Sequence, residues 1–319
     1  MREEAVLFGE TKSLVGILTE PANLHPQQPR PAVILLNPGI VHRVGPGRIY
    51  VNIARTLAKM GFVVFRFDFS GIGDSPVRQD NLPFEKSAVS DAQQAMDALQ
   101  SERGIDQFIL LGGCSGAVIS METAGCDPRV LGAILINFPV NQDEEEATAG
   151  QYSQKAAHYY WNFALYNLKS WRKLFTGKAD YLQLLRALHF QVRRFLFSRR
   201  SGCAGDNDLK RKLQTVTARG TRLSFLYSDS DIAPRDLREA LGNELARLVR
   251  LGTIALKAVP RADHTFSSLY DQERLLQLIP QQIEFITRNK NHTAMPRIAE
   301  TSLLPLDIGD SPGAAITVK

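Results

Sequence analysis

An aliphatic run that ends in two glycines, a cysteine and a serine constrains the fold of this chain most strongly. Residues 107 to 117 read QFILLGGCSGA. The short apolar segment from Phe108 to Leu111 is typical of a strand buried on both faces of a parallel sheet. Gly113-Cys114-Ser115-Gly116-Ala117 then matches a G-x-S-x-G turn with alanine in the last place, which predicts a strained turn that presents Ser115. An ordinary glycine turn is the alternative, so the rest of the chain must decide.

Strands and helices alternate on both sides of this turn. Apolar runs predict strands over residues 32–36, 62–67, 108–111, 130–136, 223–227 and 253–259, with an antiparallel pair over 5–8 and 14–18 in front of them. Helical spacing predicts helices over 48–60, 84–102, 115–124, 235–250 and 271–288. This alternation predicts an α/β fold in which helices cover both faces of a mostly parallel sheet.

The pattern changes between residues 141 and 215, where aromatic residues recur at helical spacing and no strand is indicated. We interpret this segment as a helical lid inserted into a core formed by residues 1–140 and 216–290. Trp161 and Trp171 would then contact an apolar substrate; the alternative is that they only pack the lid onto the core. We expect a partly disordered polar tail over residues 291–319.

Composition narrows the class of protein. With 319 residues and 44% hydrophobic content, the chain can bury a large core. The three cysteines, Cys114, Cys126 and Cys203, fit neither a disulfide framework nor metal-ligand spacing, so we expect free thiols in a reducing compartment. No apolar run reaches the roughly 18 residues of a membrane span, and the first residues lack the order of a signal peptide, which favours the cytoplasm.

Positive charge is concentrated in one segment. The net charge is +5, yet residues 169 to 222 contain 14 lysines and arginines against three acidic residues. No nucleic-acid motif accompanies this segment, and its aromatic residues follow helical spacing, so we do not expect nucleic-acid binding. A solvated helix face explains the charge most simply; an anionic substrate, carrier protein or membrane surface is the alternative.

Three candidate catalytic residues follow three predicted strands in the order Ser115, Asp231, His264. A serine hydroxyl needs an imidazole to accept its proton and a carboxylate to orient that imidazole. His264 follows the last strand and is the predicted general base, whereas His42 is predicted to line the pocket together with Cys114. Asp231 is favoured as the acid, with Asp229 as its rival.

An acyl-transfer intermediate also needs two hydrogen-bond donors for its oxyanion. The backbone N–H of Gly116, directly after Ser115, is one predicted donor. The other is the N–H of Ile40, because Gly39 allows close approach of the loop that follows residues 32–36.

Residues 30 to 290 resemble the α/β-hydrolase superfamily in its serine-aminopeptidase-like (S33) group. The stretches LNPGIVHRVGPGR, FRFDFSGIGDS, GGCSGA and ADHTF are most similar to hydrolases encoded beside exosortase and exopolysaccharide systems and to thioesterase-like relatives. The resemblance implies the α/β-hydrolase fold, a triad of Ser115, Asp231 and His264, no cofactor, and action on esters, thioesters or amides. Ala117 replaces the usual glycine, and Asn37-Pro38 stands where many members have a histidine before the oxyanion glycine.

These features together predict a serine hydrolase that forms an acyl-enzyme. The expected substrate is a small ester or thioester with an apolar acyl group, either free or carried on coenzyme A or an acyl carrier protein. An acyltransferase with the same triad and a hydrolase-like binding protein without turnover remain alternatives. The oligomeric state is not predicted.

Overall fold

The computed structural model describes residues 1–22, 30–80, 82–140, 205–229 and 233–288. Eight strands form one sheet in the order β1-β2-β4-β3-β5-β6-β7-β8. Pairing is antiparallel from β1 to β2 and from β2 to β4, and parallel through the rest of the sheet. The strands are β1 (Arg2–Phe8), β2 (Leu14–Glu20), β3 (Ala32–Leu36), β4 (Val64–Phe67), β5 (Phe108–Gly113), β6 (Val130–Ile136), β7 (Arg222–Ser228) and β8 (Ile254–Val259). The predicted mostly parallel sheet is confirmed.

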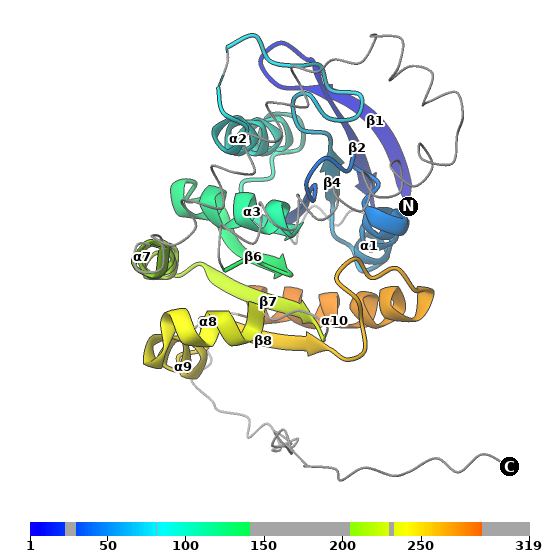
Figure 1. Ribbon diagram of the computed structural model, residues 1–319. Helices are drawn as coiled ribbons and strands as arrows, with labels where there is room; N and C mark the ends of the chain where they lie inside the picture. Colours follow the sequence, from blue (N-terminus) through cyan, green and yellow to red (C-terminus); the bar gives the residue numbers. More distant parts are fainter. Residues whose placement is uncertain (23–29, 81, 141–204, 230–232, 289–319) are drawn as a thin grey trace, which may run out of the picture. The chain divides into compact units, whose positions relative to one another are not determined.

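Helices cover both faces of the sheet (Figure 1). They are α1 (Ile49–Lys59), α2 (Phe84–Arg103), α3 (Ser115–Cys126), α7 (Gly205–Ala218), α8 (Ala233–Leu241), α9 (Asn243–Arg250) and α10 (Leu269–Thr287), with a short 3-10 turn η1 (Pro46–Arg48) before α1. Residues 235–250 form two helices and not the single one predicted. Gly242 separates α8 from α9 with φ near +51°, a left-handed value that an α-helix does not contain.

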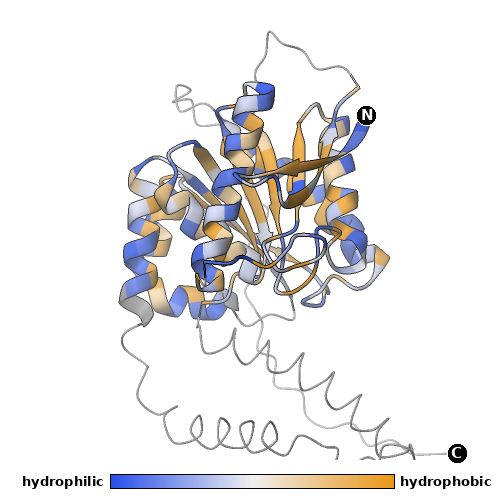
Figure 2. Cartoon of the chain, turned by 90° about the horizontal axis from the view of Figure 1, so that it is seen from above, coloured by the Kyte–Doolittle hydropathy of each residue, from blue (hydrophilic) through white to orange (hydrophobic). Residues whose placement is uncertain are grey.

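Alternation along the central strands produces two hydrophobic cores. Ile34 and Leu36 of β3 face a cluster that includes buried residues of α2, α3 and α7, whereas Val33 and Leu35 face a cluster built with α1 and α10. Successive side chains of a strand point to opposite faces, so a strand buried on both sides must be apolar throughout. In Figure 2 the strands in the interior are mostly hydrophobic, whereas the helices outside them combine hydrophobic and hydrophilic residues.

Helix α7 includes the end of the range that we predicted to be lid. Its residues Leu209, Leu213 and Val216 are buried in the same cluster as residues of α3, so this end of the predicted lid packs against the core through Leu209 and Leu213. The rest of the predicted lid, 141–204, lies outside the described residues, as does the tail predicted over 291–319.

The parallel strands place their carboxyl ends at one edge of the sheet. The segments that follow β3, β5, β6, β7 and β8 all begin there, and this is the edge at which such sheets bind ligands. Within the described part of the chain, none of the helices is both long and apolar enough to cross a lipid bilayer.

Candidate active site

The turn between β5 and α3 contains a strained residue. Cys114 has φ near 50° and ψ near −120°, whereas Ser115 is already the first residue of α3. Residues other than glycine rarely adopt this backbone conformation. Strained residues of this kind cluster at functional sites. The sequence pattern placed the centre of the turn at Ser115; the backbone places it one residue earlier, at Cys114.

The glycines around the turn show why it is centred there. A Cβ on Gly112 would clash with the backbone carbonyl of Gly116, and one on Gly116 would clash with the carbonyl of Leu36 and lie 2.7 Å from that of Asn37. A Cβ on Gly113, by contrast, would meet its nearest neighbour at 3.5 Å, which is ordinary contact. The glycines that the turn requires are therefore two residues before and two residues after Cys114.

The loop after β3 lies against this turn. The backbone N–H of Gly39 donates a hydrogen bond to Ser115 Oγ at 2.6 Å. Gly39 has φ near +54° and is part of a turn closed by a bond from Val41 N to Pro38 O at 3.1 Å. The structure thus brings the N–H of Gly39 to the turn. The side chain of Ile40, the residue whose amide we predicted as the donor, is 92% exposed.

An ion-pair network anchors the same loop. Arg43 pairs with Asp68, which follows β4 and is fully buried, and with Asp74 at 2.6 Å. Asp68 also accepts hydrogen bonds from the backbone N–H groups of Arg43 at 2.6 Å and Asp74 at 3.0 Å. Partial burial opposes the charge of Arg43, but its bonds to Asp74 and Asp68 raise the pKa of its guanidinium. The loops after β3 and β4 are therefore held together close to the turn.

Tyr50 supports the turn from inside the protein. Its hydroxyl donates to Leu36 O at 2.9 Å and accepts from Gly113 N at 3.0 Å, so one buried group joins the ends of β3 and β5. Burial raises the pKa of this phenol far above its ordinary value, although the bond from Gly113 acts in the opposite direction. Tyr50 therefore remains a neutral hydroxyl beneath the turn at any ordinary pH.

Asn137 connects the strand ends on the other side. It directly follows β6, is 3% exposed, and has a positive φ near 48°. Its Nδ2 donates to the backbone carbonyl of His264 at 2.8 Å, while its Oδ1 accepts from the N–H of Ser228 at 2.8 Å. One side chain thus fixes the end of β7 and the loop that contains the predicted base.

The predicted acids have different surroundings. Asp229 is exposed and accepts a hydrogen bond from Arg261 N at 3.2 Å, whereas Asp231 lies outside the described residues. Asp263 accepts bonds from Thr265 and Ser267, both backbone and hydroxyl, and the bonds from Ser267 contribute most to lowering the pKa of its carboxyl. Asp263 therefore shapes the loop around His264.

The remaining predicted contact residues separate into two groups. His42 is exposed in the loop that contains Gly39, and Cys114 is half-buried at the turn. Trp161 and Trp171 lie outside the described residues.

The sequence patterns missed three residues of this site: Tyr50, Asn137 and Gly112. They identified Gly39 as the residue that lets the loop approach, but not as the donor. Gly112 could have been found from the sequence, because Gly112-x-Cys114-x-Gly116 is a second match to the G-x-S-x-G pattern, with cysteine in place of serine, and overlaps the match centred on Ser115. Asn137 directly follows the strand predicted over residues 130–136, and this position at a strand end was its only readable signal. Tyr50 lies inside a predicted helix, and nothing in its local pattern separates it from a core residue.

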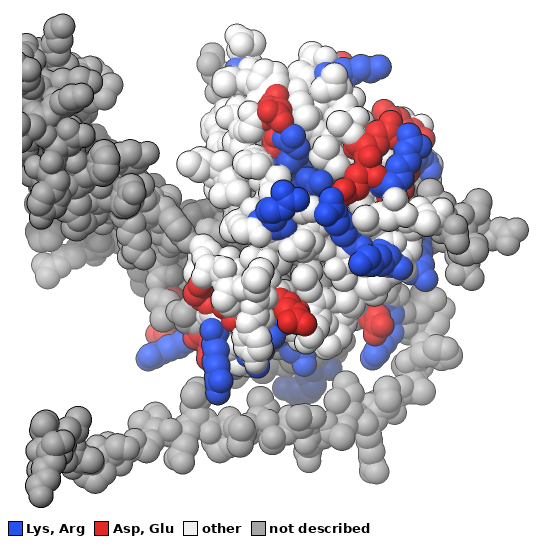
Figure 3. Space-filling view, turned by 90° about the vertical axis from the view of Figure 1, so that its right-hand side faces the viewer, with Lys and Arg blue, Asp and Glu red and all other residues white. Residues whose placement is uncertain are grey.

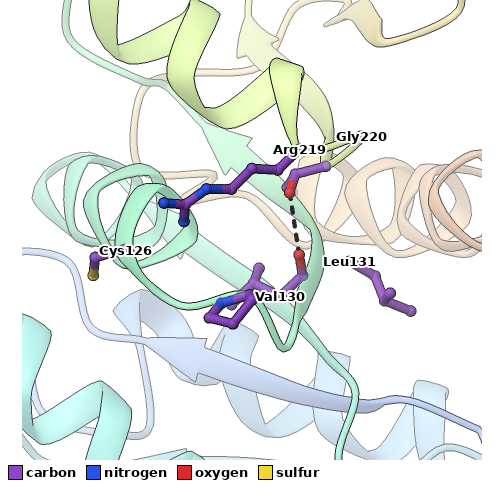
Figure 4. A pocket seen from close by; sticks show the side chains of 7 residues that line it. Cys126, Val130, Leu131, Arg219 and Gly220 are labelled. Atoms are coloured by element: carbon purple, nitrogen blue, oxygen red, sulfur yellow. Dashed lines mark hydrogen bonds between the residues drawn. The ribbon is translucent and has the colours of Figure 1, made fainter.

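A separate pocket lies at the opposite edge of the sheet (Figure 4). It has a volume of about 460 Å³ and is lined by Cys126, Pro128, Val130, Leu131, Arg219, Gly220 and Thr221. These residues lie at the end of α3 and at the amino ends of β6 and β7, so the pocket is not part of the candidate active site.

The strand order, the helices on both faces of the sheet and the strained turn after β5 define the α/β-hydrolase fold. In agreement, a family model described as serine aminopeptidase, S33, matches residues 27–181. The esterase EstD of Thermotoga maritima is 27% identical over 121 residues, which are 37% of this chain. That stretch covers only 29% of the length of EstD.

Solved structures agree on the fold. Proline iminopeptidase of Mycobacterium smegmatis matches with a TM-score of 0.55 at 16% identity, covering 89% of this chain and 98% of its own. The Pyrococcus furiosus esterase Pf2001 matches with a TM-score of 0.53 at 14% identity, covering 89% of each chain. At such low identity, these likenesses establish the fold alone.

Proposed function

We propose that this chain is a hydrolase that cleaves an ester or thioester through a covalent acyl intermediate. One observation supports this most directly. The N–H of Gly39, which follows β3, lies 2.6 Å from a side-chain oxygen of the strained turn after β5. A fixed donor is thereby placed beside two residues with nucleophilic atoms, Cys114 and Ser115. Acyl transfer needs a nucleophile and an oxyanion donor in this relation.

His264 is the proposed general base. It follows β8, and its backbone is held by Asn137. As in other sites of this kind, the imidazole would remove the proton of the nucleophile and later give a proton to the leaving group. Asp231 is the proposed orienting acid, with Asp229 as the alternative. Water would then release the acyl group.

The oxyanion of the intermediate would be held by backbone N–H groups of two loops. The N–H of Gly39 is directed at the turn, and the turn itself supplies further N–H groups at the start of α3, where Ser115 and Gly116 lie. We had predicted Ile40 and Gly116, and the distance from Gly39 to Ser115 favours Gly39 in place of Ile40. Each such donor contributes about 3 kcal/mol to transition-state stabilisation in comparable sites.

The acyl group is proposed to be apolar, because of the aromatic residues between 141 and 204, which include Trp161 and Trp171. The positive charge of residues 169–222 suits a carrier with anionic groups, such as coenzyme A or an acyl carrier protein. The likeness of the loop sequences to hydrolases encoded beside exosortase systems and to thioesterase-like relatives fits the same proposal.

Hydrolysis of a chain-length series of p-nitrophenyl esters and acyl-coenzyme A thioesters tests the function. We expect turnover by the wild type and a fall of kcat/KM of about 10²- to 10⁴-fold in His264→Gln. Glu273→Gln, an exposed change on α10, serves as the control and should retain full activity. Absence of turnover with every substrate, or equal activity of wild type and His264→Gln, would contradict the proposal.

Transfer to another acceptor is the second candidate reaction, because an acyl intermediate can react with an alcohol or amine as well as with water. Product analysis in the presence of competing glycerol or hydroxylamine separates the two. A binding protein without turnover would give no product under any of these conditions.

A further inference from the structure

Two adjacent residues at the turn between β5 and α3 could serve as the nucleophile. The sequence motif fits Ser115, with Gly113 and Ala117 around it, and it also fits Cys114, with Gly112 and Gly116 around it. We infer that the nucleophile is the thiol of Cys114 and that Ser115 belongs to the oxyanion-binding part of the site. This inference rests on the proposed acyl-transfer function and makes the enzyme a cysteine hydrolase.

Backbone conformation separates the two residues. In the α/β-hydrolase fold the nucleophile occupies the strained residue of the sharp turn from strand to helix, where its side chain is presented at the top of the sheet. That residue is Cys114, with φ near 50° and ψ near −120°. Ser115 has entered α3 and does not have a positive φ.

The steric pattern points to the same residue without reference to the torsion angles. The turn needs small residues two positions before and after the nucleophile, because backbone approaches closely there. Added Cβ atoms would clash with backbone at Gly112 and Gly116 but not at Gly113. Centring the motif on Cys114 also removes its one irregularity, since Ala117 no longer replaces a glycine.

The hydroxyl of Ser115 is already engaged by the oxyanion loop. It accepts the hydrogen bond from Gly39 N at 2.6 Å, so its oxygen occupies the place at which that donor would receive a substrate oxyanion. With Cys114 as nucleophile, the next residue is Ser115, and its N–H supplies the second donor. The side chain of Ser115 would then turn aside or donate its own proton as the substrate oxygen enters.

The surroundings suit a nucleophilic side chain and a polar ligand. Cys114 is the N-cap residue of α3, yet its thiol makes no capping hydrogen bond, and the positive end of a helix dipole favours an anion at this position. Beside the turn, Asn37 is 1% exposed, and neither atom of its amide has a partner within the described part of the chain. An unpaired buried amide is destabilising, and hydrogen bonds from a bound polar substrate would offset that cost.

The reaction is then balanced as follows. His264 takes the proton of the Cys114 thiol, and Sγ attacks the carbonyl carbon of the ester or thioester. The bond to the leaving oxygen or sulfur breaks as the imidazolium returns the proton to it, leaving an acyl thioester on Cys114. Water, deprotonated by His264, attacks this thioester; the acid departs, and the proton returns to the thiol.

The test uses the full-length chain with Cys126→Ala and Cys203→Ala, which leaves Cys114 as the one remaining cysteine of the sequence. We expect Cys114→Ala to lower kcat/KM for p-nitrophenyl acetate about 10³-fold or more, as loss of a nucleophile does. Ser115→Ala should lower it about 10-fold at most, since both backbone donors remain. Thermal unfolding of each variant reports whether it folds.

Thiol labelling provides a readout that does not require turnover. In the wild type, iodoacetamide should modify Cys114 at least ten times faster than Cys126, although Cys126 is the more exposed of the two. His264→Gln should slow the modification of Cys114, and a slowly hydrolysed ester should leave an acyl group on Cys114, detected by mass spectrometry of the peptide.

The outcomes are distinct. Loss of activity in Ser115→Ala with retention in Cys114→Ala would overturn the inference and leave the proposed hydrolase intact. Labelling of Cys114 no faster than Cys126 would also overturn it. If the wild type turned over no ester or thioester, the proposed function would fail; rapid labelling of Cys114 would then still support an activated thiol.

Discussion

Three glycines surround the turn, and they differ in the space available for a side chain: Gly112, Gly113 and Gly116. Alanine at Gly112 or Gly116 would force a methyl group into backbone carbonyls, which cannot rotate away as a flexible side chain can. We expect each of these two substitutions to lower the free energy of unfolding by about 3 kcal/mol. Gly113→Ala should change it by less than about 1 kcal/mol. Urea denaturation of the three variants measures this, and a costly Gly113→Ala would place the turn at Ser115 instead.

Asp263 predicts a pH dependence of stability. Its bonds from Ser267 and Thr265 lower the pKa of its carboxyl in the folded protein, so they stabilise the fold above the ordinary value of about 3.9 and are lost as the pH falls through the lower folded value. We expect Asp263→Asn to lower the urea midpoint at pH 7. The difference in urea midpoint between Asp263→Asn and the wild type should become smaller below about pH 4. A difference that does not change with pH would contradict a contribution from the ionised carboxylate.

At the scale of secondary-structure elements, we expect Asn137 to act as a positioning residue for His264, the proposed general base. It bonds to the backbone on both sides of the site, at Ser228 and at His264. Asn137→Asp keeps the acceptor for Ser228 but loses the donor for His264 and adds a negative charge nearby. We expect kcat/KM to fall about 10- to 100-fold, because a small displacement of a catalytic group has this effect.

The pH profile separates this role from simple destabilisation. A nearby negative charge favours the protonated imidazole, so in Asn137→Asp the acid limb of kcat/KM should move to higher pH. Asn137→Ala removes both bonds without adding charge, and its acid limb should stay in place. Unchanged kinetics in both variants would show that Asn137 has only a structural role.

The loops after β3 and β4 form a second pair of coupled elements. Arg43→Met would leave the fully buried Asp68 without its cation, at a cost of about 3 kcal/mol in the free energy of unfolding. Because the same loop contains Gly39, kcat should also fall, by about 10-fold, with little change in KM. The double variant Arg43→Met with Asp68→Asn should recover part of the stability, since no unpaired charge is then buried. If the effects of the two substitutions on the free energy of unfolding were additive, Arg43 and Asp68 would not be energetically coupled.

At the scale of the whole molecule, charge distribution bears on the substrate. On the face drawn in Figure 3, lysine and arginine side chains lie beside aspartate and glutamate, without a broad area of one sign. The excess of positive charge belongs to the segment between Lys169 and Arg222, most of which lies outside the described residues. A preference for an anionic carrier would therefore depend on that segment.

Charge reversal tests this preference. Replacing Arg193, Arg194, Arg199 and Arg200 with glutamate should weaken turnover of an acyl-coenzyme A or acyl-carrier thioester about 10-fold or more at low salt. The effect should shrink at high salt, and p-nitrophenyl acetate turnover should stay the same. Equal losses with the charged and the neutral substrate would reject the proposed role of these arginines.

The sequence by itself determined the layered fold and the edge at which the site lies. Apolar runs such as residues 32–36 and helical spacing such as residues 84–102 reflect periods set by the backbone itself, so they are readable without knowledge of partners. The order of the strand ends then placed the turn at residues 113–117 and the loop of His264 at one edge of a parallel sheet.

Only the tertiary structure decided which residue the turn presents. Two overlapping motifs match the sequence. The choice between them depends on the carbonyl of Leu36 meeting Gly116 and the N–H of Gly39 meeting Ser115, which are contacts between segments more than 70 residues apart. The hydrogen bonds of Tyr50 and Asn137 were hidden for the same reason, because their partners lie in distant segments of the chain. Such contacts leave no periodic signal along the chain, so they become visible only when the strands are assembled.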